Sequence, residues 1–126
     1  MMATITAPSM HDRMYVGTHG NVSVAFAGAL LQNVAVNDVV DLIEVPIGIK
    51  VMGVQIRSSG LGLNVKLDLA LGDTPLLSQV DVATAGVQTL PCEAYTERKS
   101  VLRATITGGV ANGELAVTPQ YVAVGY

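Results

Sequence analysis

Charged side chains are scarce in this chain of 126 residues. They make up 13% of the sequence, whereas an ordinary soluble domain carries about 25%. Large uncharged surfaces tend to associate, so a chain of this kind is difficult to keep monomeric and in solution. We therefore expect much of the surface to be covered by other protein subunits. The simpler alternative is a chain that is merely rich in Ala, Val and Gly.

Basic patches, long apolar runs and cysteine pairs are missing as well. The net charge is −3, and only Arg98, Lys99 and Arg103 bring basic residues together, so we expect no direct binding to nucleic acid.

Polar residues interrupt the longest uncharged span, residues 14–37, which argues against a membrane span and a signal peptide. Cys92 is the only cysteine. It cannot form an internal disulfide, which fits synthesis in a reducing cytoplasm.

Aromatic residues are also rare, and Trp is absent. A sugar-binding surface needs exposed rings on which a sugar can stack, so the composition disfavours a lectin. The aromatic residues are Tyr15, Phe26, Tyr95, Tyr121 and Tyr126.

The clearest strand pattern covers residues 65–71, where every second residue is aliphatic. Such a period of two predicts a strand with one face in a core and the other in water. Met52, Val54 and Ile56 follow the same pattern in an earlier strand and are expected to face inward. Residues 58–62, SSGLG, carry two glycines that favour a turn, so we expect these two strands to be antiparallel neighbours joined by a short loop.

The remaining sequence predicts an all-β chain. For residues 21–36 the pattern fits either a strand with a bend near Gly28 or one face of a helix, and we favour the strand. Residues 83–90 suit an edge strand or a close-packed loop closed by Pro91. Other strands are expected at residues 39–45, 76–82, 100–107 and 114–124. Seven or eight short strands separated by Gly, Pro and Asn turns favour an antiparallel β-sandwich or jelly roll over residues 21–126.

Residues 1–20 show no sustained period and contain Pro8, Gly17 and Gly20. They are predicted to form an extended N-terminal arm. The arm has apolar anchors but no pattern for an element of its own, so we expect it to become ordered only where a partner covers it. The competing interpretation is a leader without a role.

Acidic residues are the first candidates for chemistry. Asp38, Asp41 and Glu44 are close in sequence, but on a regular strand Asp41 and Glu44 point to opposite faces and do not converge on a metal. We expect these carboxylates to be solvated or to cap turns. A second group, Asp68, Asp73 and Asp81, is spaced too loosely for a calcium loop. Asp73 is expected to form a turn.

No other candidate has the spacing that chemistry requires. His11 and His19 lack the paired ligands of a zinc site, and Cys92 stands in no nucleophile motif and is predicted to be a packing residue. Residues 58–62 resemble a phosphate-binding loop, but no Lys-Ser or Lys-Thr pair follows and no helix is predicted after them. We therefore predict no catalytic, cofactor-binding or metal-binding residues, and no enzymatic activity.

Four segments resemble small structural proteins of tailed-bacteriophage heads: NDVVDL at 37–42, VPIG at 45–48, VMGV at 51–54 and LDLALGD at 67–73. The resemblance covers about residues 22–82. It implies a capsid decoration (cement) protein, a β-sandwich that binds the outside of the shell of major capsid protein as a homodimer or homotrimer and stabilises it. The alternative is a head-fibre or tail-associated attachment module that binds host glycans. Either the arm or the loops and the segment 93–103 would make the capsid contact.

Overall fold

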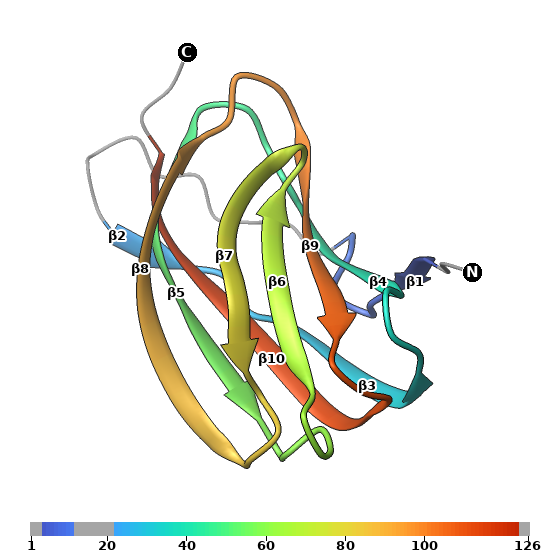
Figure 1. Cartoon of the computed structure of the whole chain (residues 1–126). Helices are drawn as coiled ribbons and strands as arrows, with labels where there is room; N and C mark the ends of the chain where they lie inside the picture. The colour runs from blue at the N-terminus through green and yellow to red at the C-terminus, as the bar shows by residue number, and fades with distance from the viewer. Residues whose placement is uncertain (1–3, 12–21, 124–126) are drawn as a thin grey trace.

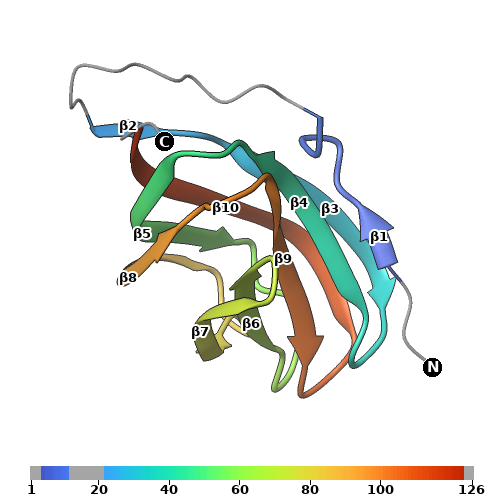
Figure 2. The same cartoon turned by 90° about the horizontal axis from the view of Figure 1, so that it is seen from above.

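The computed structural model describes residues 4–11 and 22–123. These residues form ten β-strands and no helix. The strands are β1 (Thr4–Thr6), β2 (Val22–Val24), β3 (Ala27–Val34), β4 (Val39–Val45), β5 (Ile49–Ser58), β6 (Lys66–Leu71), β7 (Thr74–Asp81), β8 (Gly86–Tyr95), β9 (Ser100–Thr107) and β10 (Ala111–Ala123). They build two sheets that pack face to face (Figures 1 and 2). The predicted all-β sandwich is confirmed.

The strand order is that of a jelly roll. Sheet A has the order β1-β4-β9-β6-β7, and sheet B has the order β2-β10-β5-β8, with β3 also paired to β10. Only Ala25 and Phe26 separate β2 from β3, so these two behave as one interrupted strand. Ten strands, less β1 and with β2 and β3 counted as one, give eight. The first of the eight pairs with the last, the second with the seventh, the third with the sixth and the fourth with the fifth, as in a long hairpin wrapped around a core.

Residues 22–34 confirm the strand prediction over the helical alternative. The interruption lies at Ala25 and Phe26, two residues before the bend that was expected near Gly28. The edge strand predicted at 83–90 is confirmed as β8, but it runs on through Pro91 to Tyr95. Its register on β5 shifts next to Pro91, as expected for a residue that has no N–H to donate.

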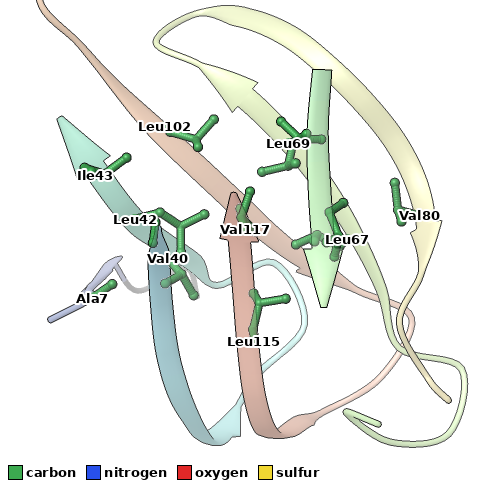
Figure 3. Close-up of a cluster of buried hydrophobic side chains, with 14 of the residues drawn as sticks. Ala7, Val40, Leu42, Ile43, Leu67, Leu69, Val80, Leu102, Leu115 and Val117 are labelled. Atoms are coloured by element: carbon green, nitrogen blue, oxygen red, sulfur yellow. The ribbon is translucent and has the colours of Figure 1, made fainter. Parts of the chain in front are cut away.

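Aliphatic side chains from the two sheets meet in the interior (Figure 3). Leu67 and Leu69 of β6 lie opposite Leu115 and Val117 of β10, and all four are buried. Val54 and Ile56 are buried too. The predicted inward positions of Leu67, Leu69, Val54 and Ile56 are therefore confirmed.

Met52 was expected to face inward, and this is wrong. Its side chain is 47% exposed. Val51 and Gly53 pair with the adjacent residues Tyr121 and Gln120 of β10, so Met52 is an extra residue in β5. Val51 and Val54 consequently both face the core although they are three residues apart. An extra residue in a strand reverses the alternation beyond it.

Residues 58–62 do not join two neighbouring strands. β5 pairs with β8 and β10 in sheet B, whereas β6 pairs with β7 and β9 in sheet A. The loop therefore crosses from one sheet to the other, and the predicted hairpin is wrong. Leu61 is buried at the end of the core, and the N–H of Leu61 donates to the carbonyl of Val82 (3.0 Å). Turn residues indicate that the chain reverses, but they do not indicate the sheet to which it returns.

Residues 4–11 are part of the sandwich. β1 pairs with β4 in parallel, and Figure 2 shows it at the rim of sheet A. Ser9 is 5% exposed, and its Oγ donates to the carbonyl of Leu42 in β4 (2.8 Å) and accepts from the N–H of Gly28 in β3 (3.1 Å). The expectation that the arm becomes ordered only on a partner is therefore wrong for these residues. The remainder of residues 1–20 lies outside the described part of the chain.

In the described part of the chain, the buried polar side chains lie where the chain passes between the sheets or where the two sheets meet at an edge. Ser9 joins the facing edges of the two sheets, Asp38 lies in the crossing from β3 to β4, and Ser58 is the last residue of β5, where the crossing to β6 begins. Thr96 lies in the crossing from β8 to β9, where its Oγ1 accepts from the N–H of Ile49 (2.9 Å) and donates to the carbonyl of Pro46 (2.7 Å). These side chains supply partners to backbone groups that have no ladder partner.

We expect Leu67→Ala to lower the free energy of unfolding by about 2–5 kcal/mol, because the side chain is buried and its removal leaves a cavity. Leu67→Asp should prevent folding. The matched control is Leu63→Ala, since Leu63 is 87% exposed, and its effect should stay within about 0.5 kcal/mol. Urea unfolding followed by circular dichroism measures all three. Equal stability of Leu67→Ala and the control would contradict the assigned register.

Ser9→Ala should lower the free energy of unfolding by about 1–3 kcal/mol, because it removes the hydroxyl partner of a buried carbonyl and of a partly buried N–H. The control is Ser78→Ala, which removes the same atom from an exposed position on β7. Thermal and urea unfolding of both variants test whether the arm contributes to the fold. Indistinguishable curves would show that it does not.

Candidate interaction surfaces

Asp41 and Glu44 point to the same face of sheet A, contrary to prediction. Asp41 pairs with Arg103 and Ile43 pairs with Leu102, so Leu42 is an extra residue in β4. Leu42 and Ile43 are consequently both buried, and the carboxylates on either side of them face outward. The cause is a β-bulge, which regular alternation does not reveal.

The two carboxylates lie next to basic side chains of the chain itself. The Nε of Arg103 lies 2.9 Å from Oδ1 of Asp41. Oε1 of Glu44 lies 3.6 Å from Nδ1 of His11, and its Oε2 lies 3.5 Å from Nζ of Lys99. Exposed ion pairs of this kind contribute about 0–1 kcal/mol each. Residues 4–11 and 22–123 contain no group of three or more His, Cys, Asp or Glu side chains that could hold a metal. His19 lies outside the described residues.

The other aspartates support turns and irregular strand positions. Asp38 accepts from the N–H of Ala35 (3.1 Å), Asp81 from that of Ala83 (3.0 Å), and Asp68 from that of Gln79 (2.7 Å), which has a positive φ of 57°. Asp73 is the second residue of the two-residue turn between β6 and β7, after Gly72 with φ 59°. Glycine first in a two-residue loop is typical of hairpins. The turn-forming roles predicted for Asp38 and Asp73 are confirmed.

Cys92 and the Ser58–Gly62 loop also have structural roles. Cys92 is half-buried on β8 and packs against the core, which confirms the predicted packing role. Burial raises the pKa of its thiol, so the reactive thiolate is disfavoured at neutral pH. Ser59 Oγ accepts from the N–H of Glu114 (2.9 Å), and Ser58 Oγ lies 3.4 Å from the carbonyls of Val82 and Thr84. The serines thus fasten the loop to β10 and to the β7–β8 crossing.

A groove with side chains of both charges lies at one end of the sandwich. Its volume is about 560 Å³, and the β6–β7 and β8–β9 turns contribute much of its wall. We call it the charged groove, and its charged residues are Glu44, Asp73, Glu97, Arg98, Lys99 and Arg103. Arg98 forms no ion pair in the part of the chain that the structure describes. It is therefore available to a partner.

An apolar surface lies on the outside of sheet B, along β2 and β3. We call it the apolar face, and it consists of Val22, Val24, Phe26 and Leu30, which are 59–68% exposed. The sequence pattern located this strand but not its orientation. Ser23 pairs with the buried Tyr121 and Ala27 is fully buried, so the small residues face inward and the large apolar ones face outward. An alternating pattern alone does not say which face is covered.

No helix in the described part of the chain has the length and apolar character needed to cross a membrane. No family model matches the sequence, and no curated protein matches it.

Solved structures do contain chains of the same fold. One is a chain of the capsid of Ralstonia phage GP4, with 17% identity and a TM-score of 0.72 over 98% of this chain and 100% of that chain. A second, in the cyanophage Pam1 capsid asymmetric unit, has 25% identity and a TM-score of 0.62 over 86% and 91%. A third, in the acidic stable capsid structure of Helicobacter pylori bacteriophage KHP30, has 16% identity and a TM-score of 0.62 over 86% and 92%.

All three matches come from bacteriophage capsids. The identities of 17% and 16% establish a common fold. Because nearly all of each matched chain is covered, those chains are similar in length to this one. The likeness is therefore to complete small chains and not to one domain of a large protein.

Cys92 should react slowly with iodoacetamide at pH 7.5 compared with free cysteine, because burial raises the pKa of its thiol and only the thiolate reacts. The rate should rise as the pH is increased above the pKa of a free thiol. Mass spectrometry of the intact protein measures it. Fast alkylation at neutral pH would contradict the packing role and support a nucleophilic role for Cys92.

Proposed function

We propose that this chain is a non-enzymatic structural protein of a bacteriophage virion, which binds the outside of the capsid shell as a homo-oligomer and stabilises the shell. The observation that carries the proposal is the similarity, over most of both chains, to small chains of phage capsids, one of them at 25% identity. The segments that resemble decoration proteins support the same role.

The surface chemistry suits a protein that works in an assembly. A charged fraction of 13% leaves large uncharged areas, and the apolar face is one of them. Many copies on a repeating shell turn weak individual contacts into strong total binding, because each bound copy raises the effective concentration of further contacts. A small sandwich with little charge therefore needs only modest contacts per copy.

Within this proposal, the charged groove is the attachment surface, and the partner is the major capsid protein. Residues 4–11 are already engaged in the sandwich, which removes them as a free anchor. In the groove, Arg98 forms no ion pair among the described residues, and carboxylates of the chain lie at the same end of the sandwich. A polar surface with charges of both signs orients a partner through electrostatic complementarity.

The alternative is an attachment module for host glycans. Sugar platforms use exposed aromatic rings near one another. Among the described residues, Phe26 and Tyr95 are exposed whereas Tyr121 is buried. Tyr95 lines the charged groove, and Phe26 belongs to the apolar face. Rings in separate surfaces give this alternative less support.

The test uses virions of the phage that encodes the chain, prepared with its gene disrupted. Purified chain should co-sediment with these particles to saturation, and electron microscopy should show added density at regular positions on the outside. Particles with the chain should resist heating better than particles without it. Absence of binding would contradict the proposal, and binding to a glycan array instead would favour the attachment module.

Arg98→Glu should weaken retention on these particles by about tenfold, because it reverses a charge that faces the proposed partner. The matched control is Lys66→Glu, the same kind of reversal at an exposed position of β6 outside the groove. Wild-type retention should fall as salt is raised. Equal retention of the two variants would exclude the charged groove as the attachment surface.

A further inference from the structure

We infer that two copies of this chain associate about a two-fold axis through the apolar face, with Phe26 of each copy in a hollow of the other and Arg57 of each opposite Glu114 of the other. The inference rests on the homo-oligomeric part of the proposed function and specifies its surface and symmetry. It is tested on the purified chain without capsids, so its failure is distinguishable from failure of capsid binding.

The apolar face is large enough for such a contact. Val22, Val24, Phe26 and Leu30 are 61%, 59%, 68% and 63% exposed. Together they present on the order of 400–500 Å² of apolar surface, which is near the largest patch of a typical monomer. Two copies would bury on the order of 1,000 Å² through these side chains alone, the lower range of specific interfaces.

The same surface contains a hollow of about 450 Å³. Gly28, Ala29 and Ala116 contribute small residues to its lining, and Phe26 and Leu30 contribute large ones. The Phe26 ring lies over Gly28, where an added Cβ would be 3.0 Å from Cε1 of the ring. The ring and the hollow are thus neighbours on one surface. A two-fold axis between them brings each ring to the hollow of the other copy.

Arg57 and Glu114 identify the occupant as a second copy. Both are exposed and line the hollow, Arg57 from β5 and Glu114 from β10. Neither forms an ion pair among the residues that the structure describes. A two-fold contact requires that a surface complement itself, and a surface with one charge of each sign beside an apolar centre does so. A surface built for a different partner has no need of this internal balance of charge.

Sedimentation of the wild-type chain between about 1 and 100 µM should show a monomer–dimer equilibrium. Arg57→Glu and Glu114→Arg should each raise the dissociation constant by at least about tenfold, because each places like charges opposite one another twice in the dimer. Phe26→Ser should weaken association similarly. Lys66→Glu on sheet A is the control and should leave the dissociation constant unchanged. Circular dichroism melting should show all variants folded.

Mixing Arg57→Glu with Glu114→Arg provides the decisive measurement. Each copy in such a mixture carries two charges of one sign, so heterodimers should form while the separate variants stay monomeric. The double variant should also dimerise, but an ion pair within one copy would give that result too. Association is restored in the mixture only if the charges of one copy lie opposite those of the other copy.

Three outcomes would overturn the inference. The first is a monomeric wild-type chain throughout this range. The second is a dimer that the Arg57, Glu114 and Phe26 variants leave intact, which would place the contact elsewhere. The third is a monomeric chain whose binding to particles is lost in these variants, which would assign the apolar face to the capsid shell.

Discussion

The fold depends on the passage of the chain between its two sheets. A jelly roll crosses between sheets repeatedly, and every crossing takes backbone N–H and C=O groups out of the hydrogen-bonded ladders near the core. In the described part of the chain, the buried polar side chains are Ser9, Asp38, Ser58 and Thr96, and each lies at such a crossing or bridges the facing edges of the two sheets. Everything else in the interior is aliphatic, aromatic or small. Short hydroxyl and carboxylate side chains at these places let the remaining core stay apolar.

The alternating residues predicted most of the strands and their core faces, because burial of one sheet face imposes a period of two. Leu67 and Leu69 are examples. The two wrong expectations about which way a strand residue faces have one physical cause, which is an extra residue in the strand. The bulge at Leu42 brings Asp41 and Glu44 to one face, and the extra residue in β5 opposite β10 places Met52 outward. A bulge depends on the partner strand, so its position is not present in the local pattern.

The surfaces were less predictable than the core for a related reason. Residues 93–103 were recognisable as the charge-rich segment, and the structure adds Glu44 from the end of β4 and Asp73 from the β6–β7 turn. The sequence did not indicate that the apolar face is exposed, because Val22, Val24 and Phe26 alternate in the same way as buried strand residues. Only the pairing of Ser23 with the buried Tyr121 reveals that they face outward. Low charge in the whole chain indicated that such a surface exists, but it did not indicate the location.

The two surfaces differ in chemistry, and this difference links the proposals. The charged groove has charges of both signs and lies at one end of the sandwich, whereas the apolar face lies on the outside of sheet B. A contact through the apolar face leaves the charged groove of each copy open, so one dimer presents two grooves related by a two-fold axis. Binding of the first groove raises the effective concentration of the second groove at the shell. This strengthens binding only if the shell offers two sites that are related by the same two-fold symmetry. Under the two proposals together, the symmetry of the dimer restricts strong binding to pairs of shell sites that are related by a two-fold axis or a close equivalent of one.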